Sequence, residues 1–172
     1  IGRIWQVGNY FYVENRSELA RELSELLSTK TDNLGHIVGS TKTHWKTFFA
    51  NSGAEANEGA IKVARRWGEK NLNGAPTIIS AKRSFHGRTL ATLAATGQEA
   101  FHTTFLPMPE GFDVVPLNDA AALEEKLECL SKTGRGACAV MLECIQGEGG
   151  IWPATANYLH EVRKICDAHN LV

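Results

Sequence analysis

The chain has 172 residues, of which 43% are hydrophobic, and its 18 basic and 19 acidic residues give a formal net charge of −1. This length and composition allow one folded α/β unit with a sizeable core, and the near-neutral charge argues against nucleic acid or a membrane surface as the partner. No apolar run approaches the roughly 20 residues that span a bilayer, and no signal-peptide pattern opens the chain, so we expect a cytoplasmic protein that binds small molecules.

The first predicted element is an amphipathic helix over residues 18–27, with Asn15 and Ser17 as candidate caps. Its apolar face is expected to pack into a core and consists of Leu19, Leu23, Leu26 and Leu27. A short strand is expected over residues 47–50, directly before a turn of small residues.

A second helix begins at this turn, which consists of Ser52, Gly53 and Ala54 and is called the anion site below. Backbone N–H groups at a helix start lack intrahelical partners and carry partial positive charge, so they can hold a phosphoryl group without a lysine. The turn therefore indicates a phosphorylated ligand or cofactor. The expected buried face of this helix is formed by Ala56, Ala60, Val63, Ala64 and Trp67. Asn73, Gly74 and Pro76 end the helix.

The remaining chain alternates between buried strands and helices. Strands are expected over residues 77–80, 114–117 and 137–144. A helix over 120–130 is capped by Asn118 or Asp119, and another begins at Thr155 or Asn157. The second of these is expected to bury Leu159, Val162, Ile165 and Cys166. This order predicts an α/β fold with a mostly parallel sheet and flanking helices, which collects ligands at the carboxyl ends of its strands.

Residues 84–89, called the aromatic loop below, follow the first of these buried strands. The loop combines a phenylalanine, a histidine, a glycine and an arginine. Phe85 is suited to stack on an aromatic cofactor, although a loop phenylalanine is more often part of a core. Arg88 offers the planar fork that binds a carboxylate, although an isolated arginine is usually a surface charge.

Residues 143–150, called the glutamate turn below, follow the strand predicted over 137–144. Glu143 and Glu148 place two carboxylates beside flexible glycines, where they either bind a ligand or partner or merely face solvent. The glycines lack the spacing of a dinucleotide fingerprint, and no P-loop motif occurs in the chain.

Cysteines and histidines form no metal-site pattern. Cys129, Cys138, Cys144 and Cys166 include no C-x-x-C pair, and the six histidines include no H-x-x-x-H pair. We expect buried free thiols and no metal.

Taken together, three segments resemble the class III aminotransferases that depend on pyridoxal phosphate, in the branch of acetylornithine and ornithine aminotransferases. In the family's order and approximate spacing, the chain reads FFANSGAEANE from Phe48, FHGRT from Phe85 and IQGE from Ile145. The resemblance covers nearly the whole chain. It implies that the chain is part of the large domain of a fold-type I transferase.

The resemblance also implies roles for particular residues. The anion site would hold the phosphate of pyridoxal 5'-phosphate, and Phe85 would stack on the pyridine ring beside His86. Arg88 would bind a substrate carboxylate, and Glu148 would pair with or release another arginine as substrates alternate. Glu143 is expected near the substrate in a supporting role.

Two departures from the family pattern limit these implications. Cys144 stands where the family commonly has a proline, which should relax the turn without removing its side chains. The chain also ends at Val172, before the family's Schiff-base lysine and the aspartate that contacts the pyridine nitrogen, and Lys62 and Lys82 do not replace that lysine. We therefore expect residues 1–172 to be a large domain truncated at both ends and inactive alone, with a lead-in at 1–45 and an α/β core at 46–172.

The activity implied by the resemblance is transamination of N-acetylornithine with 2-oxoglutarate in arginine biosynthesis, by a homodimer. Ornithine, succinylornithine and 4-aminobutyrate are alternative amino donors. The aromatic loop argues against the related aminomutase that makes 5-aminolevulinate. A non-catalytic fragment that binds cofactor or a partner remains a separate hypothesis.

Overall fold

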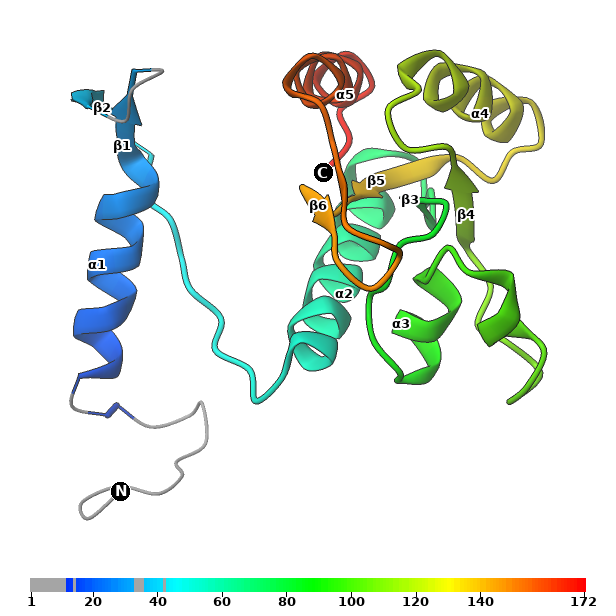
Figure 1. Ribbon diagram of the computed structural model, residues 1–172, viewed down its shortest axis with the longest axis horizontal. Helices are drawn as coiled ribbons and strands as arrows, with labels where there is room; N and C mark the ends of the chain where they lie inside the picture. The colour runs from blue at the N-terminus through cyan, green and yellow to red at the C-terminus, as the bar shows by residue number, and fades with distance from the viewer. Residues whose placement is uncertain (1–11, 14, 33–35, 42) are drawn as a thin grey trace. The chain divides into compact units, whose positions relative to one another are not determined.

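The computed structural model describes residues 12, 13, 15–32, 36–41 and 43–172, and the chain divides into two compact units (Figure 1). Residues 1–50 form the first unit and residues 51–172 form the second. Within the described parts, no helix is both long and apolar enough to cross a membrane.

The first unit contains helix α1 (Arg16–Ser28) and an antiparallel hairpin of β1 (Thr29–Thr31) and β2 (Ile37–Ser40). The predicted helix is confirmed. Asn15 occupies its N-cap position, but the Asn15 side chain makes no capping hydrogen bond. Its predicted core packing is wrong for the described unit, because α1 buries no residue and Leu19, Leu26 and Leu27 are exposed. A short hairpin and an extended segment provide no apolar layer broad enough to cover the helix.

The strand predicted over residues 47–50 is also wrong. These residues have no regular secondary structure, and Phe48 is exposed. A strand needs a hydrogen-bonded neighbour. None of the pairings recorded for the described residues includes this segment.

The second unit is an α/β structure in which helices separate the strands of the central sheet along the chain. Its elements are α2 (Gly53–Asn71), β3 (Thr77–Ala81), α3 (Leu90–Ala95), the 3-10 helix η1 (Glu99–His102), β4 (Phe112–Val115), α4 (Ala120–Lys132), β5 (Ala137–Met141), β6 (Ile145–Gln146), β7 (Trp152–Pro153) and α5 (Ala156–Ala168).

The central sheet has the strand order β4-β3-β5, and both pairings are parallel, as predicted. Val172 returns beside β5, where its N–H donates to the carbonyl of Cys138 (3.1 Å) and its carbonyl accepts from Val140 (3.0 Å). The second predicted strand begins two residues early, at Phe112. The third ends at Met141, because the chain then leaves the sheet for the antiparallel β6-β7 hairpin.

The sheet is covered on both faces, with α4 and α5 on one side and α2 and α3 on the other (Figure 1). Successive strand residues point to opposite faces, so Ile79 packs in the cluster under α4 and α5, whereas Ile78 packs with Ile61 and Ala64 of α2. These two clusters form the core of the unit.

The predicted buried face of α2 is mostly wrong. Ala64 is buried as expected, but Val63 is 65% exposed and Trp67 is 38% exposed. The helix instead buries Ile61, Ala64 and Gly68. A Cβ atom on Gly68 would lie 2.0 Å from the Ala75 carbonyl oxygen, so this glycine allows the close approach that decides which face of α2 turns inward.

The caps of α4 and α5 are confirmed. The Asp119 carboxylate accepts from the Ala122 N–H (2.9 Å), and the Thr155 hydroxyl accepts from the Tyr158 N–H (3.2 Å). The inward face of α5 is as predicted, with Tyr158 buried in addition.

The prediction of buried thiols is only half right. Cys138 and Cys166 are buried, whereas Cys129 and Cys144 are exposed. Cys138 belongs to strand β5 of the central sheet and Cys166 to the inward face of α5. Cys129 lies on the outer side of α4, and Cys144 lies in the glutamate turn.

Candidate functional site

The three residues of the anion site lie at the start of α2, as predicted. Ser52 is the N-cap, and its hydroxyl oxygen accepts from the Glu55 N–H (3.2 Å). The Glu55 carboxylate in turn accepts from the Asn51 N–H (2.7 Å). No hydrogen bond to another described residue is recorded for the N–H groups of Gly53 and Ala54. These two donors therefore remain available for a ligand.

The electrostatics of this helix start favour an anion. Helix α2 has 19 residues, so its peptide dipoles add to a partial positive charge at Ser52 and Gly53. A hydroxyl has one donor and two acceptor positions, so Ser52 can cap the helix and still donate to an anion. The site can hold a phosphoryl group without a basic side chain.

The aromatic loop lies directly against the anion site. A Cβ atom on Gly87 would lie 2.9 Å from the Cβ of Ala54 and 3.1 Å from its Cα, so only glycine permits this approach. Asn57 donates to the His86 carbonyl (2.7 Å), and the Thr89 hydroxyl donates to Glu58 (2.5 Å). Helix α2 thus fixes the loop next to its own N-terminus.

The His86 side chain is buried and uncharged at neutral pH. It is 5% exposed, and burial lowers its pKa from 6.5 to about 4. Its backbone N–H donates to the Thr96 hydroxyl (3.0 Å), while the ring Nε2 has no partner among the described residues. The ring is therefore a neutral polar group with one open hydrogen-bonding position.

Phe85 is held on two sides. Its ring meets the Phe101 ring edge to face, with centroids 6.3 Å apart, and its N–H donates to the Glu143 carboxylate (3.0 Å). The Glu143 carboxylate therefore connects the glutamate turn to the backbone of the aromatic loop. Its predicted contact with substrate stays a prediction.

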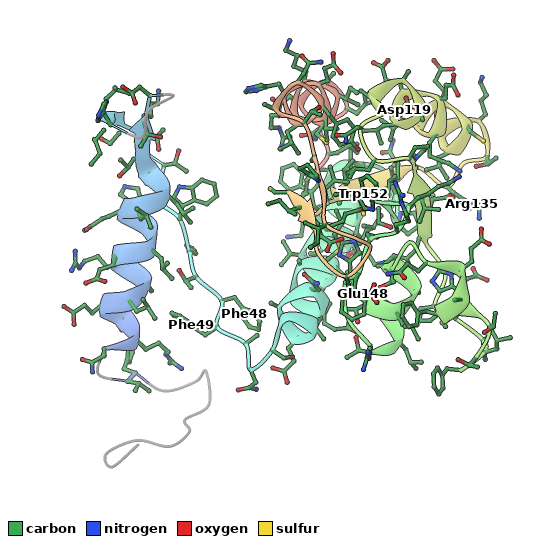
Figure 2. All side chains as sticks on the ribbon, viewed as in Figure 1. Phe48, Phe49, Asp119, Arg135, Glu148 and Trp152 are labelled. Atoms are coloured by element: carbon green, nitrogen blue, oxygen red, sulfur yellow. The ribbon has the colours of Figure 1, made fainter. Side chains whose placement is uncertain are left out.

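The glutamate turn packs on the chain that leaves β3. Gly149 approaches so closely that a Cβ atom would lie 2.1 Å from the Arg83 carbonyl oxygen. The buried Gln146 side chain donates to the Lys82 carbonyl (2.9 Å), and its Oε1 has no partner among the described residues. Arg83 lies over the Trp152 ring, 4.9 Å from its centroid. Figure 2 shows Glu148 and Trp152 on the segment between β5 and α5.

The two remaining predicted residues are exposed. Arg88 makes no hydrogen bond or ion pair with the described residues, so its guanidinium is open to a ligand. Glu148 accepts a hydrogen bond from the side chain of Gln98 (2.5 Å). The structure thus brings the anion site, the aromatic loop and the glutamate turn together at the carboxyl ends of β3 and β5.

Sequence reasoning missed the residues that hold these segments in place. Asn57, Thr96 and Gln98 make the side-chain contacts. Thr96 and Gln98 belong to no periodic or spaced chemical motif, and Asn57 lies in the motif that starts at Phe48 but was given no role there. Only the position of Asn57, one helical turn after the anion site, offered a signal, because such a residue lies near the ligand end of the helix.

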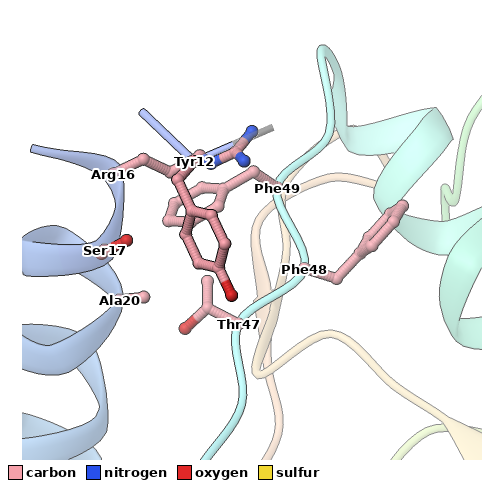
Figure 3. Close-up of a pocket in the computed structure, with 7 residues that line it drawn as sticks. All are labelled: Tyr12, Arg16, Ser17, Ala20, Thr47, Phe48 and Phe49. Atoms are coloured by element: carbon pink, nitrogen blue, oxygen red, sulfur yellow. The ribbon is translucent and has the colours of Figure 1, made fainter. Parts of the chain in front are cut away.

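A separate hollow of about 340 Å³ lies in the first unit (Figure 3). Figure 3 shows the rings of Tyr12 and Phe49 facing the hollow, while Phe48 points away from them. Tyr12 is almost fully exposed. No buried polar group is recorded among the residues that line the hollow, so we assign it no role.

Comparisons with known proteins agree with the geometry of the second unit. A family model described as aminotransferase class III matches residues 11–172. Acetylornithine aminotransferase of Caldanaerobacter subterraneus is 48% identical over 95% of this chain, and that of Synechocystis is 40% identical over the whole chain. In both comparisons the aligned part is 37% of the relative's length.

Two solved structures have the same fold. N-acetylornithine aminotransferase of Stenotrophomonas maltophilia has a TM-score of 0.65 and 32% identity, covering 99% of this chain and 36% of that protein. Ornithine aminotransferase of Toxoplasma gondii has a TM-score of 0.78 and 25% identity, and the match covers 99% of this chain and 37% of that protein. The α/β unit is therefore part of the fold-type I architecture.

Proposed function

Because this chain belongs to the class III aminotransferases, we propose that it forms part of the cofactor-binding domain of a transaminase that acts on N-acetylornithine and 2-oxoglutarate. The chain spans about 37% of the length of its relatives. We propose that the complete protein supplies the lysine and aspartate of the cofactor site, forms a homodimer and serves arginine biosynthesis in the cytoplasm.

The residues of the site fit the cofactor of this family. Class III aminotransferases depend on pyridoxal 5'-phosphate, which, when bound, withdraws electrons from the substrate's amine carbon. The free N–H groups of Gly53 and Ala54 suit its phosphate. Phe85 offers an aromatic ring in the loop that contacts Ala54 through Gly87, and the neutral His86 places no charge next to the cofactor ring.

The other residues of the chain have roles in binding and orientation. Glu143 and Phe101 restrain Phe85, so the ring that contacts the cofactor is held before binding. Arg88 is proposed to bind the substrate's carboxylate through its planar fork. Glu148 places a second negative charge at the same edge of the sheet. It is proposed to pair with another arginine or to release it, according to the charge of the substrate side chain.

The observation that carries the proposal is the contact between Gly87 and Ala54. This contact places the start of α2, which suits a phosphate, next to the aromatic loop, which suits an aromatic ring of a cofactor. A cofactor with a phosphate arm attached to an aromatic ring requires these two features side by side. The names of the relatives favour acetylornithine among the possible amino donors.

The test uses the complete protein, with pyridoxal 5'-phosphate added and 2-oxoglutarate as the amino acceptor. We expect the highest kcat/KM with N-acetylornithine, ahead of ornithine, succinylornithine and 4-aminobutyrate. A higher value for another donor would replace the proposed substrate. Cofactor binding without any turnover would support the non-catalytic alternative.

A second measurement tests the anion site directly. Ser52→Ala should weaken binding of pyridoxal 5'-phosphate but leave binding of pyridoxal, which lacks the phosphate, nearly unchanged. The control Ser131→Ala, in α4, should change neither affinity. Equal losses for both ligands in Ser52→Ala would show that the residue supports the fold and does not bind phosphate.

A further inference from the structure

Gln98 connects two of the segments that form the site. It follows α3 and immediately precedes η1. Its side-chain Nε2 donates to the Glu148 carboxylate (2.5 Å) and to the Ser84 carbonyl (3.2 Å). The same amide group thus contacts the glutamate turn and the aromatic loop.

The chemistry of the two partners determines how the amide is oriented. A carboxylate and a carbonyl oxygen only accept hydrogen bonds, so the NH2 group and not the oxygen of Gln98 must face both. Each of its two hydrogens then has one partner. The arrangement uses all the donors of this side chain.

The backbone beneath Gln98 is well fixed. The Arg83 N–H donates to the Gly97 carbonyl (2.7 Å), and the Gly97 N–H donates to the Ser84 hydroxyl (3.0 Å). A Cβ atom on Gly97 would lie 2.0 Å from the Ala81 carbonyl oxygen, so the segment sits directly on the end of β3. Gln98 therefore projects from a rigid base.

No described cation pairs with the Glu148 carboxylate. The residue is exposed, and no ion pair with a described residue is recorded for it. Gln98 is neutral, so it restrains the carboxylate without cancelling its charge. A charged group on a flexible side chain is thereby kept in one place at the edge of the site.

We propose that Gln98 is a positioning residue that holds the Glu148 carboxylate and so sets the affinity of the site for the substrate with a second carboxylate. This inference rests on the proposed function, in which one site alternately binds 2-oxoglutarate and N-acetylornithine. The first has a charged side chain and the second a neutral one. A released Glu148 can approach the substrate side chain and repel a carboxylate, while it leaves a neutral amide almost unaffected.

The test is Gln98→Met in the complete protein, because methionine keeps the length of the side chain and removes both donors. We expect KM for 2-oxoglutarate to rise about fivefold, as for loss of a charge-assisted hydrogen bond at an exposed site, with KM for N-acetylornithine changed less than about twofold. Binding of glutarate, a dicarboxylate that cannot react, should weaken by the same factor in calorimetry.

The matched control is the same substitution in a Glu148→Ala background. There Gln98→Met should have no further effect on either KM, because the group on which it acts is gone. A fivefold effect that persists in that background, or equal changes for both substrates, would overturn the inference. If the unsubstituted protein shows no transamination at all, the proposed function fails instead.

A second variant covers the case in which Gln98→Met does not fold. Gln98→Glu has the same shape but places two carboxylates in contact, which raises the pKa of one of them. KM for 2-oxoglutarate should then increase as the pH rises and this carboxylate loses its proton, more steeply than in the unsubstituted protein. An unchanged pH profile would contradict the proposed contact.

Discussion

Gly87→Ala tests the contact that joins the aromatic loop to the anion site. Gly87 has φ +132°, a conformation that L side chains rarely adopt. A new methyl group would lie 2.6 Å from the Thr92 hydroxyl, 2.9 Å from the Ala54 Cβ and 3.1 Å from the Ala54 Cα. None of these atoms is the end of a long flexible side chain, so the loop itself must move.

Two costs add in this variant. Overpacking costs about 1–3 kcal/mol, and the unfavourable backbone conformation about 1–3 kcal/mol. Alanine also reduces the conformational entropy of the unfolded chain, which stabilises the folded state by about 0.4–1 kcal/mol. We expect a net loss of about 2–4 kcal/mol, measured as a lower urea midpoint of the cofactor-free complete protein. Affinity for pyridoxal 5'-phosphate should fall at least about tenfold, since the loop retreats from α2.

Gly147→Ala is the matched control. A Cβ atom on Gly147 meets nothing within 4 Å, and its φ lies outside the left-handed region. The same chemical change should therefore alter stability by less than about 1 kcal/mol. If Gly87→Ala and Gly147→Ala have the same urea midpoint and cofactor affinity, the proposed role of the Gly87 contact is refuted.

Three further predictions concern His86, Arg88 and Asp119. The folded pKa of His86 is about 4, below the unfolded value of 6.5, so the unfolded state binds more protons and stability falls as the pH drops from 6.5 to 4. The decrease in the free energy of unfolding approaches about 3 kcal/mol. Urea unfolding of His86→Gln, measured at pH 7 and 4.5, should not show this decrease. Arg88→Ala should raise KM for carboxylate substrates about tenfold or more, while the control Arg135→Ala leaves it unchanged. Asp119→Ala removes the α4 cap and should cost about 1 kcal/mol in urea unfolding, whereas Glu124→Ala on the same helix should cost less than about 0.5 kcal/mol.

The order of strands and helices in the second unit could be predicted because local signals agree there. Continuous apolar runs mark β3 and β5, and Asp119 and Thr155 precede α4 and α5 with the expected capping chemistry. Each signal depends on residues near in sequence. The elements that were predicted correctly are those for which such local information suffices.

The orientation of α2 was not predictable in the same way. An apolar stripe that includes Val63 and Trp67 has helical spacing, yet the helix buries Ile61 and Gly68. The inward face depends on the close approach of Gly68 to Cys138 of β5, two residues that lie on separate elements and far apart in sequence. Hydrophobicity alone favours the bulkier stripe, because the hydrophobic pattern does not show how closely the α2 backbone approaches its neighbours.

The candidate site shows the same division. Ser52, Phe85 and Glu148 could be proposed as site residues because their chemistry and spacing form recognisable patterns. Gln98 and Thr96 were missed, because a polar residue in a connecting segment has no distinctive pattern until the fold places it beside a partner. Their importance follows from their contacts with the recognised residues.

These contacts also reduce the conformational entropy that is lost when a ligand binds. Asn57 and Thr96 fix the backbone of His86, and Glu143 fixes that of Phe85, all through groups of the chain itself. A loop held in this way loses little conformational freedom when a ligand arrives, so more of the contact energy remains as affinity. The open donors of Gly53 and Ala54 lie beside this fixed loop. The wall formed by α2 and the aromatic loop is therefore arranged for its ligand before the ligand binds.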